Sequence, residues 1–507
     1  MKTIKTALIS VWDKEGIIDF AKFLNDQGVK IISTGGTKKT LEENGIDVIS
    51  ISSITGQKEV MDGRVKTLHP KIFGGILADR DNNSHLKDLN EMNSLCIDVV
   101  VVNLYPFKSK AVDQKLDLKK AIEFIDIGGP SMLRAAAKNH ENVIPICKTS
   151  DYDFFKEIYL NNNGLINSDY RRDFATKVFK LTNNYDSLIY NYFSDDDSLK
   201  IDLYKKENLR YGENPHQSAS FYLPQDKSKQ WSQLSGKKLS YNNYFDIESA
   251  ISIVYEFKDI ACSIIKHSNP CGFAFGENSK NAYLNAVSVD PVSYFGGIVA
   301  LNSEVNLDLA NELTKSFLEC IVAPSFSDDA KEVLIKKKNL RLIEISRDSI
   351  NENKLSMKSV FNGFLIQDKD SIIDDENNFK IVSKRKPTKN EFKALILGWK
   401  LVKYVKSNAI VFSNQSQLLG VGAGQMSRID STKIAINKAQ EHGLDLKDSI
   451  MASDAFFPFP DCVELAFKHG VSGVIHPGGS IKDEEIIKVV DKLNMYMVTT
   501  NKRHFLH

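Results

Sequence analysis

The sequence predicts an α/β protein, and three observations support this class. Short apolar runs alternate with amphipathic stretches from the N-terminus onward, as in the βαβ units that build parallel sheets. Glycine-containing turns join several of these runs to the segment that follows. The composition, with 42% hydrophobic and 26% charged residues, is that of a globular protein. At 507 residues the chain is long enough for about three or four domains.

The first segment shows the alternation most clearly. Apolar residues recur at helical spacing between residues 14 and 27, and Gly28 ends that stretch. We expect a second helix over 38–44 and buried strands over 6–11, 30–33 and 47–49. This βαβαβ order predicts a parallel sheet with helices on its faces.

The stretch Ser33-Thr34-Gly35-Gly36-Thr37 joins the second strand to the next helix. Glycines let backbone amides approach an anion, and a helix start adds donors and a favourable dipole. Ser10 and Lys14 are expected at the neighbouring strand end. The pattern favours a phosphate site, although a tight turn with a threonine cap would have a similar sequence.

Two further stretches add candidate residues to this segment. Residues 63–70 carry Arg64 and Lys66 in a region with little helix or strand character, so they form either a solvated loop or a cationic neighbour of the anion turn. A buried strand is expected over 98–107, ended by Pro106, with Asn103 and Tyr105 at its carboxyl end.

A Gly-Gly turn at 128–129 opens an expected helix over 131–139. Asp126 precedes this turn, and Lys138 lies two turns into the helix. Either residue suits a binding site, but Asp126 could also be a turn residue and Lys138 a surface residue. Residues 151–193 have a helical pattern and predict a connector, and the acidic run 194–198 predicts a linker to the second half.

The second half is organised around an apolar run, 260–265, that ends in Lys266 and His267. The run predicts a short buried strand, and Asn-Pro-Cys-Gly at 269–272 predicts the turn that follows. Open α/β sheets place their chemistry at such strand ends. The two residues could equally solvate the strand end.

Other motifs of the second half are less specific. The GxGxG at 420–424 lacks the spacing and the acidic partner of a dinucleotide site. Residues 454–461 hold three Phe and two Pro, which form either an aromatic platform for a flat heterocycle or a packed turn. The charged region 367–391 indicates an internal boundary.

The net charge, the cysteine spacing and the length of the apolar runs argue against several classes of protein. The net charge of +1 gives no general case for binding nucleic acid or a membrane surface. None of the six cysteines forms a CxxC pair, which disfavours zinc and redox motifs and fits a reducing cytoplasm. No run approaches a signal peptide or a membrane helix.

Together these motifs resemble the bifunctional purine-biosynthesis enzymes that have AICAR transformylase and IMP cyclohydrolase activities. The matching stretches are 33–37, 63–70, 103–107, 125–129, 134–140, 209–217, 266–267, 422–425, 427–428 and 454–459. The resemblance implies a methylglyoxal-synthase-like cyclohydrolase domain with its helical connector (1–198). It also implies a transformylase region (199–507) of two cytidine-deaminase-like α/β units that meet near 367–391 and lack zinc. Trp12 departs from the family, which usually has a small polar residue there.

The resemblance also implies roles for individual residues. In the cyclohydrolase the catalytic residues would be Lys66, Tyr105, Asp126 and Lys138, and the substrate would contact Ser10, Lys14, Ser33, Thr34, Gly35, Gly36, Thr37, Arg64, Thr67, Asn103, Gly128 and Gly129. In the transformylase Lys266 and His267 would be catalytic, and Arg210, Tyr211, Asn408, Arg428, Phe456, Asp461 and Arg503 would bind substrate.

The implied function is the last two steps of IMP synthesis. The co-substrate 10-formyltetrahydrofolate would formylate AICAR to FAICAR, releasing tetrahydrofolate, and FAICAR would then cyclise to IMP without a catalytic metal. The resemblance implies a cytoplasmic homodimer with transformylase sites completed across the interface, and no nucleic-acid or membrane partner. The alternative is a purine-nucleotide or folate sensor that binds without turnover.

Overall fold

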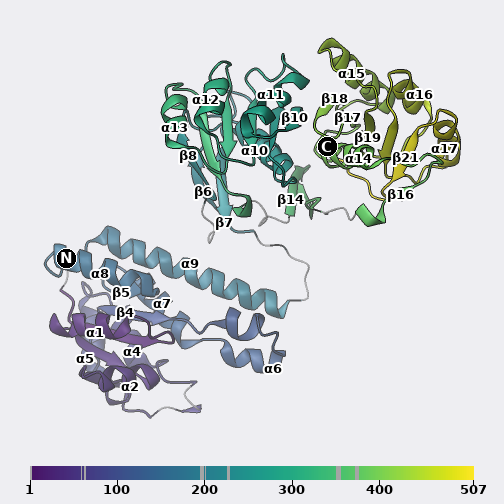
Figure 1. Ribbon diagram of the computed structural model, residues 1–507. Helices are drawn as coiled ribbons and strands as arrows, with labels where there is room; N and C mark the ends of the chain where they lie inside the picture. The colour runs from purple at the N-terminus through teal and green to yellow at the C-terminus, as the bar shows by residue number, and fades with distance from the viewer. Residues whose placement is uncertain are drawn as a thin grey trace. The chain divides into compact units, whose positions relative to one another are not determined.

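The chain folds into two compact units, Met1–Lys200 and Ile201–His507 (Figure 1). The computed structural model describes residues 3–58, 60–61, 64–194, 199, 201–224, 229–349, 355–371 and 376–507. Most of the expected linker, residues 195–198, lies outside the described residues. So do residues 372–375 of the expected internal boundary.

The first unit is built on a five-stranded sheet in the order β3-β2-β1-β4-β5. All four pairings are parallel, as the sequence predicts. The strands are β1 (Thr6–Val11), β2 (Lys30–Ser33), β3 (Val48–Ser50), β4 (Val99–Asn103) and β5 (Ile144–Ile146). β4 ends at Asn103 and not at Pro106, because its partner β1 ends at Val11, the residue opposite Asn103. The strand order reverses between β1 and β4, where such sheets bind ligands at their carboxyl edge.

Helices cover both faces of this sheet. Successive residues of β1 alternate between two cores, since Ala7 and Ile9 pack in one and Leu8 in the other. The helices are α1 (Ile17–Asp26), α2 (Gly35–Glu43), α3 (Ile51–Thr55), α4 (Pro70–Leu77), α5 (Asn83–Glu91), α6 (Leu118–Ala121), α7 (Gly128–Lys138), α8 (Tyr152–Asn161) and α9 (Ser168–Phe193). α9 packs against α7 and β5, so the expected connector is part of the unit (Figure 1).

Two helix starts differ from the sequence expectation, and both bear on the candidate site. α2 begins at Gly35 and not at Lys38, so the Gly-Gly-Thr stretch forms its first turn. α1 begins at Ile17 and not at Lys14, because Gly16 adopts a left-handed conformation (φ 66°) before the helix. Lys14 therefore lies in the loop between β1 and α1.

The second unit contains two six-stranded mixed sheets with the same arrangement. In each sheet an antiparallel hairpin lies beside three parallel strands, and an antiparallel strand completes the far edge. The first sheet has the order β10-β9-β11-β12-β13-β8, and the second has the order β18-β17-β19-β20-β21-β16. This repeat confirms the predicted pair of similar α/β units.

The strands of the first sheet are β8 (Trp231–Ser235), β9 (Ala261–Lys266), β10 (Asn269–Phe275), β11 (Ile298–Leu301), β12 (Cys320–Ala323) and β13 (Arg341–Ile345). Those of the second are β16 (Lys380–Ile381), β17 (Ile410–Ser413), β18 (Leu418–Gly422), β19 (Ile450–Ser453), β20 (Gly473–His476) and β21 (Tyr496–Thr499). Two separate hairpins are formed by β6 (Leu203–Asn208) with β7 (Ser220–Pro224) and by β14 (Leu355–Val360) with β15 (Gly363–Asp368).

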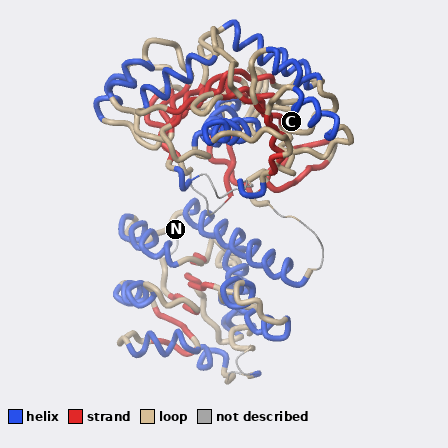
Figure 2. Tube along the Cα trace, turned by 45° about the vertical axis from the view of Figure 1, so that its right-hand side comes forward, coloured by secondary structure: helices blue, strands red, loops and turns tan. Residues whose placement is uncertain are grey.

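One core joins the two halves of this unit. It contains residues of both sheets together with residues of the helices α10 and α14, including the buried Trp399. Figure 2 shows helices at the centre of the unit with strands around them. The helices are α10 (Tyr241–Val254), α11 (Ser279–Val289), α12 (Leu307–Leu313), α13 (Asp328–Leu334), α14 (Lys389–Val402), α15 (Arg428–Glu441), α16 (Asp461–Lys468) and α17 (Asp483–Lys492).

The turn after Lys266 is not where the sequence places it. β9 ends at Lys266, which pairs with Asn269, the first residue of β10. The turn is therefore His267-Ser268, with φ of 53° and 60°. Asn-Pro-Cys-Gly forms strand with an irregularity after Pro270. Proline is tolerated there because β10 is the edge strand of its sheet.

Candidate functional site

The candidate site of the first unit lies at the carboxyl edge of its sheet. Strands β1, β2 and β4 are parallel neighbours, so their carboxyl ends meet at this edge. The loop after β1 carries Lys14, the turn after β2 opens α2, and the segment after β4 carries Tyr105. The structure therefore brings together three of the stretches that the sequence singles out.

The first turn of α2 has the geometry of an anion site. Its N-terminal backbone amides have no partner within the helix, and a helix start attracts negative charge. Thr34 precedes it in extended conformation, and Gly35 has φ of 53°. A methyl group on Gly35 would come within 3.3 Å of Lys66 Nζ. The lysine ammonium therefore lies close to this turn.

Three predicted phosphate residues are engaged with the protein itself. The fully buried Ser33 donates its hydroxyl to Ile9 O (2.7 Å). Thr37 Oγ1 donates to Val11 O (2.9 Å) and accepts from Val11 N (3.1 Å). Lys14 Nζ donates to Val11 O, to Trp12 O (3.2 Å) and to Thr37 Oγ1 (3.2 Å). These side chains hold the β1–α1 loop against α2, whereas the predicted Ser10 is half-buried in β1.

The loop after Arg64 spans the distance between two parts of the site. Lys66 lies beside Gly35, as described above, and Thr67 Oγ1 would lie 3.1 Å from a methyl group on Gly128. Arg64 pairs with Glu123, and both side chains are exposed. The cationic loop thus connects the anion turn to the turn that carries Asp126.

Asp126 is held at the start of α7. Gly129 N donates to its Oδ1 (2.9 Å), and Asp126 N donates to Tyr185 Oη (2.8 Å). A methyl group on Gly129 would lie 2.4 Å from Asp126 Oδ2, so only glycine leaves room for the carboxylate. Burial raises the pKa of Asp126, and hydrogen bonds from the backbone amides of Gly129 and Tyr105 oppose the rise. The sequence does not indicate that Tyr185 contacts Asp126, since Tyr185 lies 59 residues away in α9.

An aromatic pair lies beside these residues. The rings of Trp12 and Tyr105 are 4.9 Å apart at 58°, and both are exposed. Asn103 fixes the Trp12 backbone, because its Oδ1 accepts from Trp12 N (2.5 Å) and Asp13 N (3.0 Å) and its Nδ2 donates to Asp13 O (2.9 Å). Asn103, predicted to bind substrate, therefore fixes the loop that carries Trp12.

Lys138 lies at the opposite end of α7 from Asp126. It is the last residue of the eleven-residue helix α7, which begins beside Asp126. A rise of 1.5 Å per residue separates the two ends of this helix by about 15 Å. The family role of Lys138 thus has no counterpart in the contacts of Asp126.

The candidate site of the second unit contains the His267-Ser268 turn. Lys266 Nζ donates to Phe295 O (2.5 Å), and His267 is exposed at the tip of the hairpin. Asp246 Oδ1 of α10 accepts from Ser268 N (2.7 Å) and Ser268 Oγ (3.2 Å). Burial raises the pKa of Asp246, while the hydrogen bonds from Ser268 and the charges of His267 and Lys266 oppose the rise.

Asn269 links this turn to the second sheet. Its Nδ2 donates to His267 O (3.1 Å), and its Oδ1 accepts from Lys406 N (3.0 Å). Lys406 lies two residues before the predicted Asn408, whose Nδ2 donates to Gln425 O (2.9 Å) and Met426 O (3.1 Å). The structure therefore places Lys266, His267 and Asn408 in one region.

Arg428 lies in the same region at the start of α15. Its Nη2 pairs with Asp454 Oδ1 (3.0 Å), and its Nε donates to Ser453 Oγ (3.2 Å). Asp454 is fully buried and also accepts from Ser407 Oγ. The guanidinium groups of Arg428 and Arg503 lie over the ring of Phe505, at 5.9 and 4.3 Å. The sequence motif included Asp454, but its role in holding Arg428 was not predicted.

The remaining predicted residues of the second unit are Phe456, Asp461, Arg210 and Tyr211. Phe456 is 42% exposed, and Asp461 accepts from Cys462 N at the start of α16. Arg210 lies 5.0 Å from the ring centre of Tyr211. Their loop reaches the first turn of α10, where Asn242 Nδ2 donates to Glu213 O (3.2 Å).

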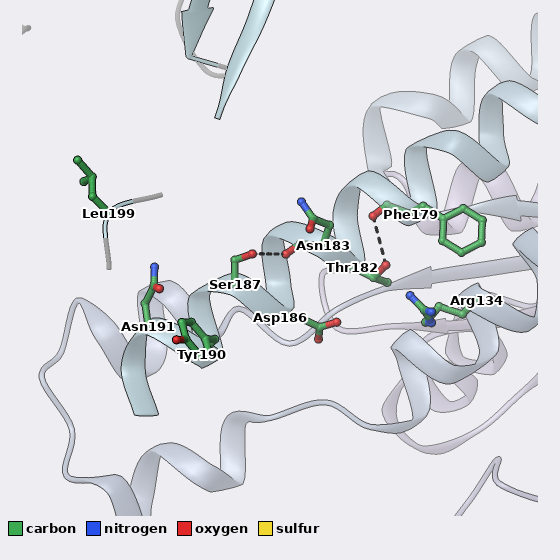
Figure 3. A pocket seen from close by; sticks show the side chains of 9 residues that line it. All are labelled: Arg134, Phe179, Thr182, Asn183, Asp186, Ser187, Tyr190, Asn191 and Leu199. Atoms are coloured by element: carbon green, nitrogen blue, oxygen red, sulfur yellow. Dashed lines mark hydrogen bonds between the residues drawn. The ribbon is translucent and has the colours of Figure 1, made fainter. Parts of the chain in front are cut away.

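Two surface cavities lie away from the predicted residues. One, of about 530 Å³, follows α9 between Arg134 and Leu199 (Figure 3). The guanidinium of Arg134 lies 5.6 Å from the ring centre of Phe179 there. The other, of about 1050 Å³, is lined by residues from both halves of the second unit, including Glu277 and Lys393. The predicted sites therefore rest on clustered polar groups and not on these hollows.

The described residues include neither a helix suited to crossing a membrane nor a cluster of metal-ligating side chains. In that part of the chain no helix has the length and apolarity needed to cross a membrane. Within the same residues no group of three or more His, Cys, Asp or Glu side chains is placed to hold a metal ion.

Known proteins match almost the whole chain. The model of an AICARFT/IMPCHase bienzyme family matches residues 136–438, and that of an MGS-like domain matches residues 16–131. Proteins of Bacillus cereus (strain B4264) and Bacillus thuringiensis (strain Al Hakam), both named bifunctional purine biosynthesis protein PurH, are 49% identical. Each alignment covers 99% of this chain and 100% of the relative.

A solved structure, described as the crystal structure of ForH, is 33% identical. The match covers 38% of this chain and 100% of the solved chain, with a TM-score of 0.34. Since the family model spans more than half of the chain and full-length relatives are 49% identical, the chain belongs to the AICARFT/IMPCHase bienzyme family.

Proposed function

We propose that this protein catalyses the last two steps of IMP synthesis, as its family name and its relatives' names indicate. The transformylase would act in residues 199–507 and the cyclohydrolase in residues 1–198. The observation that carries the proposal is the presence of two separate clusters of charged residues, one in each compact unit. Lys66 and Asp126 belong to the first cluster, and Lys266 and His267 belong to the second.

In the proposed formyl transfer the 5-amino nitrogen of AICAR attacks the formyl carbon of 10-formyltetrahydrofolate. His267 takes the proton from this amine as a general base. The new C–N bond forms first and places negative charge on the formyl oxygen; the bond to N10 of the folate then breaks, and N10 takes the proton from His267 and leaves as tetrahydrofolate. Lys266 supplies positive charge to the oxyanion, and its amine already donates to a carbonyl oxygen 2.5 Å away.

Binding of AICAR would use the planar cations of this region. Arg428 is fixed by the buried Asp454 and can present its remaining donors to a phosphate or carboxamide. The exposed ring of Phe456 suits stacking on a heterocycle. Arg210, Tyr211, Asp461 and Arg503 are proposed contacts by family resemblance.

In the proposed cyclisation the carboxamide nitrogen of FAICAR attacks its own formyl carbon, and water leaves. The reaction is intramolecular, so holding the substrate in a reactive conformation supplies much of the acceleration. The first turn of α2 would bind the 5′-phosphate, with Lys66 nearby. Asp126 would orient the formyl hydrate, and Tyr105 would assist proton transfer. Lys138, at the other end of α7, stays a proposed catalytic residue by family resemblance.

We also propose a homodimer. The hairpin β14–β15 exposes the apolar side chains of Phe361, Phe364 and Leu365, and burial against a second copy would remove them from water. Sedimentation should give about twice the 57.0 kDa mass of one chain. A monomer at assay concentration would contradict the proposal. The six cysteines are free thiols, which supports the proposed cytoplasmic location.

Separate assays of the two reactions test the proposed function. The double variant Lys266→Ala/His267→Ala should lose formyl transfer from 10-formyltetrahydrofolate to AICAR, by about 10²-fold or more for each lost group. It should still convert supplied FAICAR to IMP. Saturable binding of AICAR by the wild-type protein without formation of tetrahydrofolate or IMP would instead indicate a sensor.

A further inference from the structure

The turn that carries His267 has an unusual backbone. Two adjacent residues, His267 and Ser268, have positive φ (53° and 60°), and neither is glycine. L side chains rarely adopt this conformation, and the surrounding structure must hold it in place. Two-residue hairpin turns of this kind usually contain Asn-Gly or Asp-Gly. The residue types His and Ser therefore do not explain this turn, and contacts with other residues must stabilise it.

Asp246 supplies the contacts that hold the turn. Its Oδ1 accepts from the backbone amide of Ser268 (2.7 Å) and from the hydroxyl of the same residue (3.2 Å). The amide is the backbone group that directly follows His267. Fixing it limits the range of conformations that His267 can adopt.

Asp246 is itself carried on a well-anchored element. Ser240 and Asn243 form a reciprocal capping box at the start of α10. Ile247 and Ile251 of the same helix pack in the core that joins both halves of the unit. The carboxylate thus extends from a rigid helix to a strained turn, as a supporting side chain should.

We propose that Asp246 is a positioning residue for formyl transfer, which holds the His267-Ser268 turn so that the imidazole of His267 and the amine of Lys266 meet the substrate together. The inference rests on the proposed function of the Lys266-His267 pair. The inference goes beyond that function by assigning a role to a residue on a different element, 20 positions before Lys266. Asp246 touches neither reacting group, and its effect passes through the Ser268 amide.

A matched pair of variants isolates the hydrogen bond. Asp246→Asn and Asp246→Leu have side chains of similar size, and both remove the charge. Only Asn keeps an oxygen that can accept from Ser268 N. Glu248→Gln on the same helix is the control, since Glu248 is exposed and pairs with Lys369.

We expect Asp246→Leu to lower the kcat of formyl transfer by about 100-fold, the loss typical of a reacting group misplaced by about 1 Å. The KM for AICAR should stay within a few-fold, because the phosphate and ring contacts lie elsewhere. Asp246→Asn should retain a kcat within about tenfold of the wild-type value. Glu248→Gln should behave as wild type.

The other reaction of the same chain is the internal control. Cyclisation of supplied FAICAR should be unchanged in both Asp246 variants, and each should unfold in urea at about the wild-type midpoint. A wild-type kcat for Asp246→Leu overturns the inference. An equal fall in kcat in both variants also overturns it, because it would assign the effect to charge. A loss expressed only in KM overturns it as well. Failure of the proposed function is separable, because His267→Ala would then retain formyl transfer.

Discussion

At the scale of single residues, Gly129 leaves the space in which the Asp126 carboxylate lies. A methyl group at this position would come 2.4 Å from Asp126 Oδ2 and 3.1 Å from Leu104 Cδ2. Gly129→Ala should therefore displace the carboxylate and lower cyclisation of FAICAR by about 100-fold, with formyl transfer unchanged. Steady-state rates of both reactions measure this.

The control for this prediction is a glycine with free space around it. Gly363→Ala in the β14–β15 hairpin brings its methyl group no closer than 3.9 Å to another atom and should leave cyclisation intact. Unchanged cyclisation in Gly129→Ala would show that the carboxylate position does not matter to the reaction.

Trp12 should report on the first site directly. Its ring pairs with Tyr105 beside the anion turn, and it is 45% exposed, whereas Trp399 is buried in the second unit. A purine ring stacked on Trp12 would change its fluorescence. Titration with IMP should alter the emission of the wild-type protein, and Trp12→Phe should lose most of that change.

The same variants test whether the indole contributes to binding. Trp12→Phe keeps an aromatic face, and Trp12→Ser removes it. We expect the KM for FAICAR to rise more in Trp12→Ser, by about tenfold, the value of one lost stacking contact. Equal fluorescence changes in wild type and Trp12→Phe would place the ligand away from this ring.

At the scale of elements, the sequence predicts strands better than turns. β1 and β2 have the bounds expected from the sequence, 6–11 and 30–33, because the apolar residues at their centres are buried in the sheet. The turn after Lys266 was wrongly placed at Asn-Pro-Cys-Gly, since local turn propensity favours those residues. At the turn as it is found, the Ser268 amide donates to Asp246 of α10, a tertiary contact that no local pattern reveals.

The candidate site was predictable to a similar extent. The sequence places Lys14, Thr37 and Asn103 at the edge of the sheet, and the structure has them there. The sequence does not reveal that these three side chains form hydrogen bonds at the end of β1 and in the loop that follows it. A side chain's partners depend on its rotamer and on neighbours from other strands. The position of Lys66 beside Gly35 likewise depends on the course of an irregular loop.

The end of β20 carries a buried histidine that should make stability depend on pH. Burial lowers the pKa of His476 to about 4, and Nε2 has no hydrogen-bond partner in the described structure. The unfolded chain binds a proton near pH 6.5, whereas the folded protein resists protonation until about pH 4. Stability is therefore complete above about pH 6.5 and falls by about 3 kcal/mol as the pH drops to about 4.

His476→Gln removes this titration while keeping a polar side chain of similar length. Its urea midpoint should fall less than that of the wild-type protein between pH 7 and pH 4.5. The remaining acid sensitivity, from groups common to both proteins, cancels in the comparison. Parallel curves for the two proteins would show that His476 is not a source of acid sensitivity.

At the scale of the whole molecule, two differently built units carry the two proposed sites. The parallel sheet of the first unit gathers its residues at one edge, where the strand order reverses. The second unit repeats one arrangement twice, and Asn269 joins the hairpin turn of one half to Lys406 of the other. The residues of each proposed site thus belong to one unit.

This separation predicts that two inactive variants will complement each other in solution. Asp126→Asn should formylate AICAR but accumulate FAICAR, whereas His267→Ala should cyclise FAICAR but not make it. Mixed in equal amounts with AICAR and 10-formyltetrahydrofolate, the two proteins should form IMP after a lag in which FAICAR builds up. The lag should shorten as the His267→Ala protein is increased, because capture of the free intermediate is then faster. IMP formation followed by chromatography measures this, and a mixture that makes FAICAR but no IMP would mean that the intermediate must pass between sites of a single molecule.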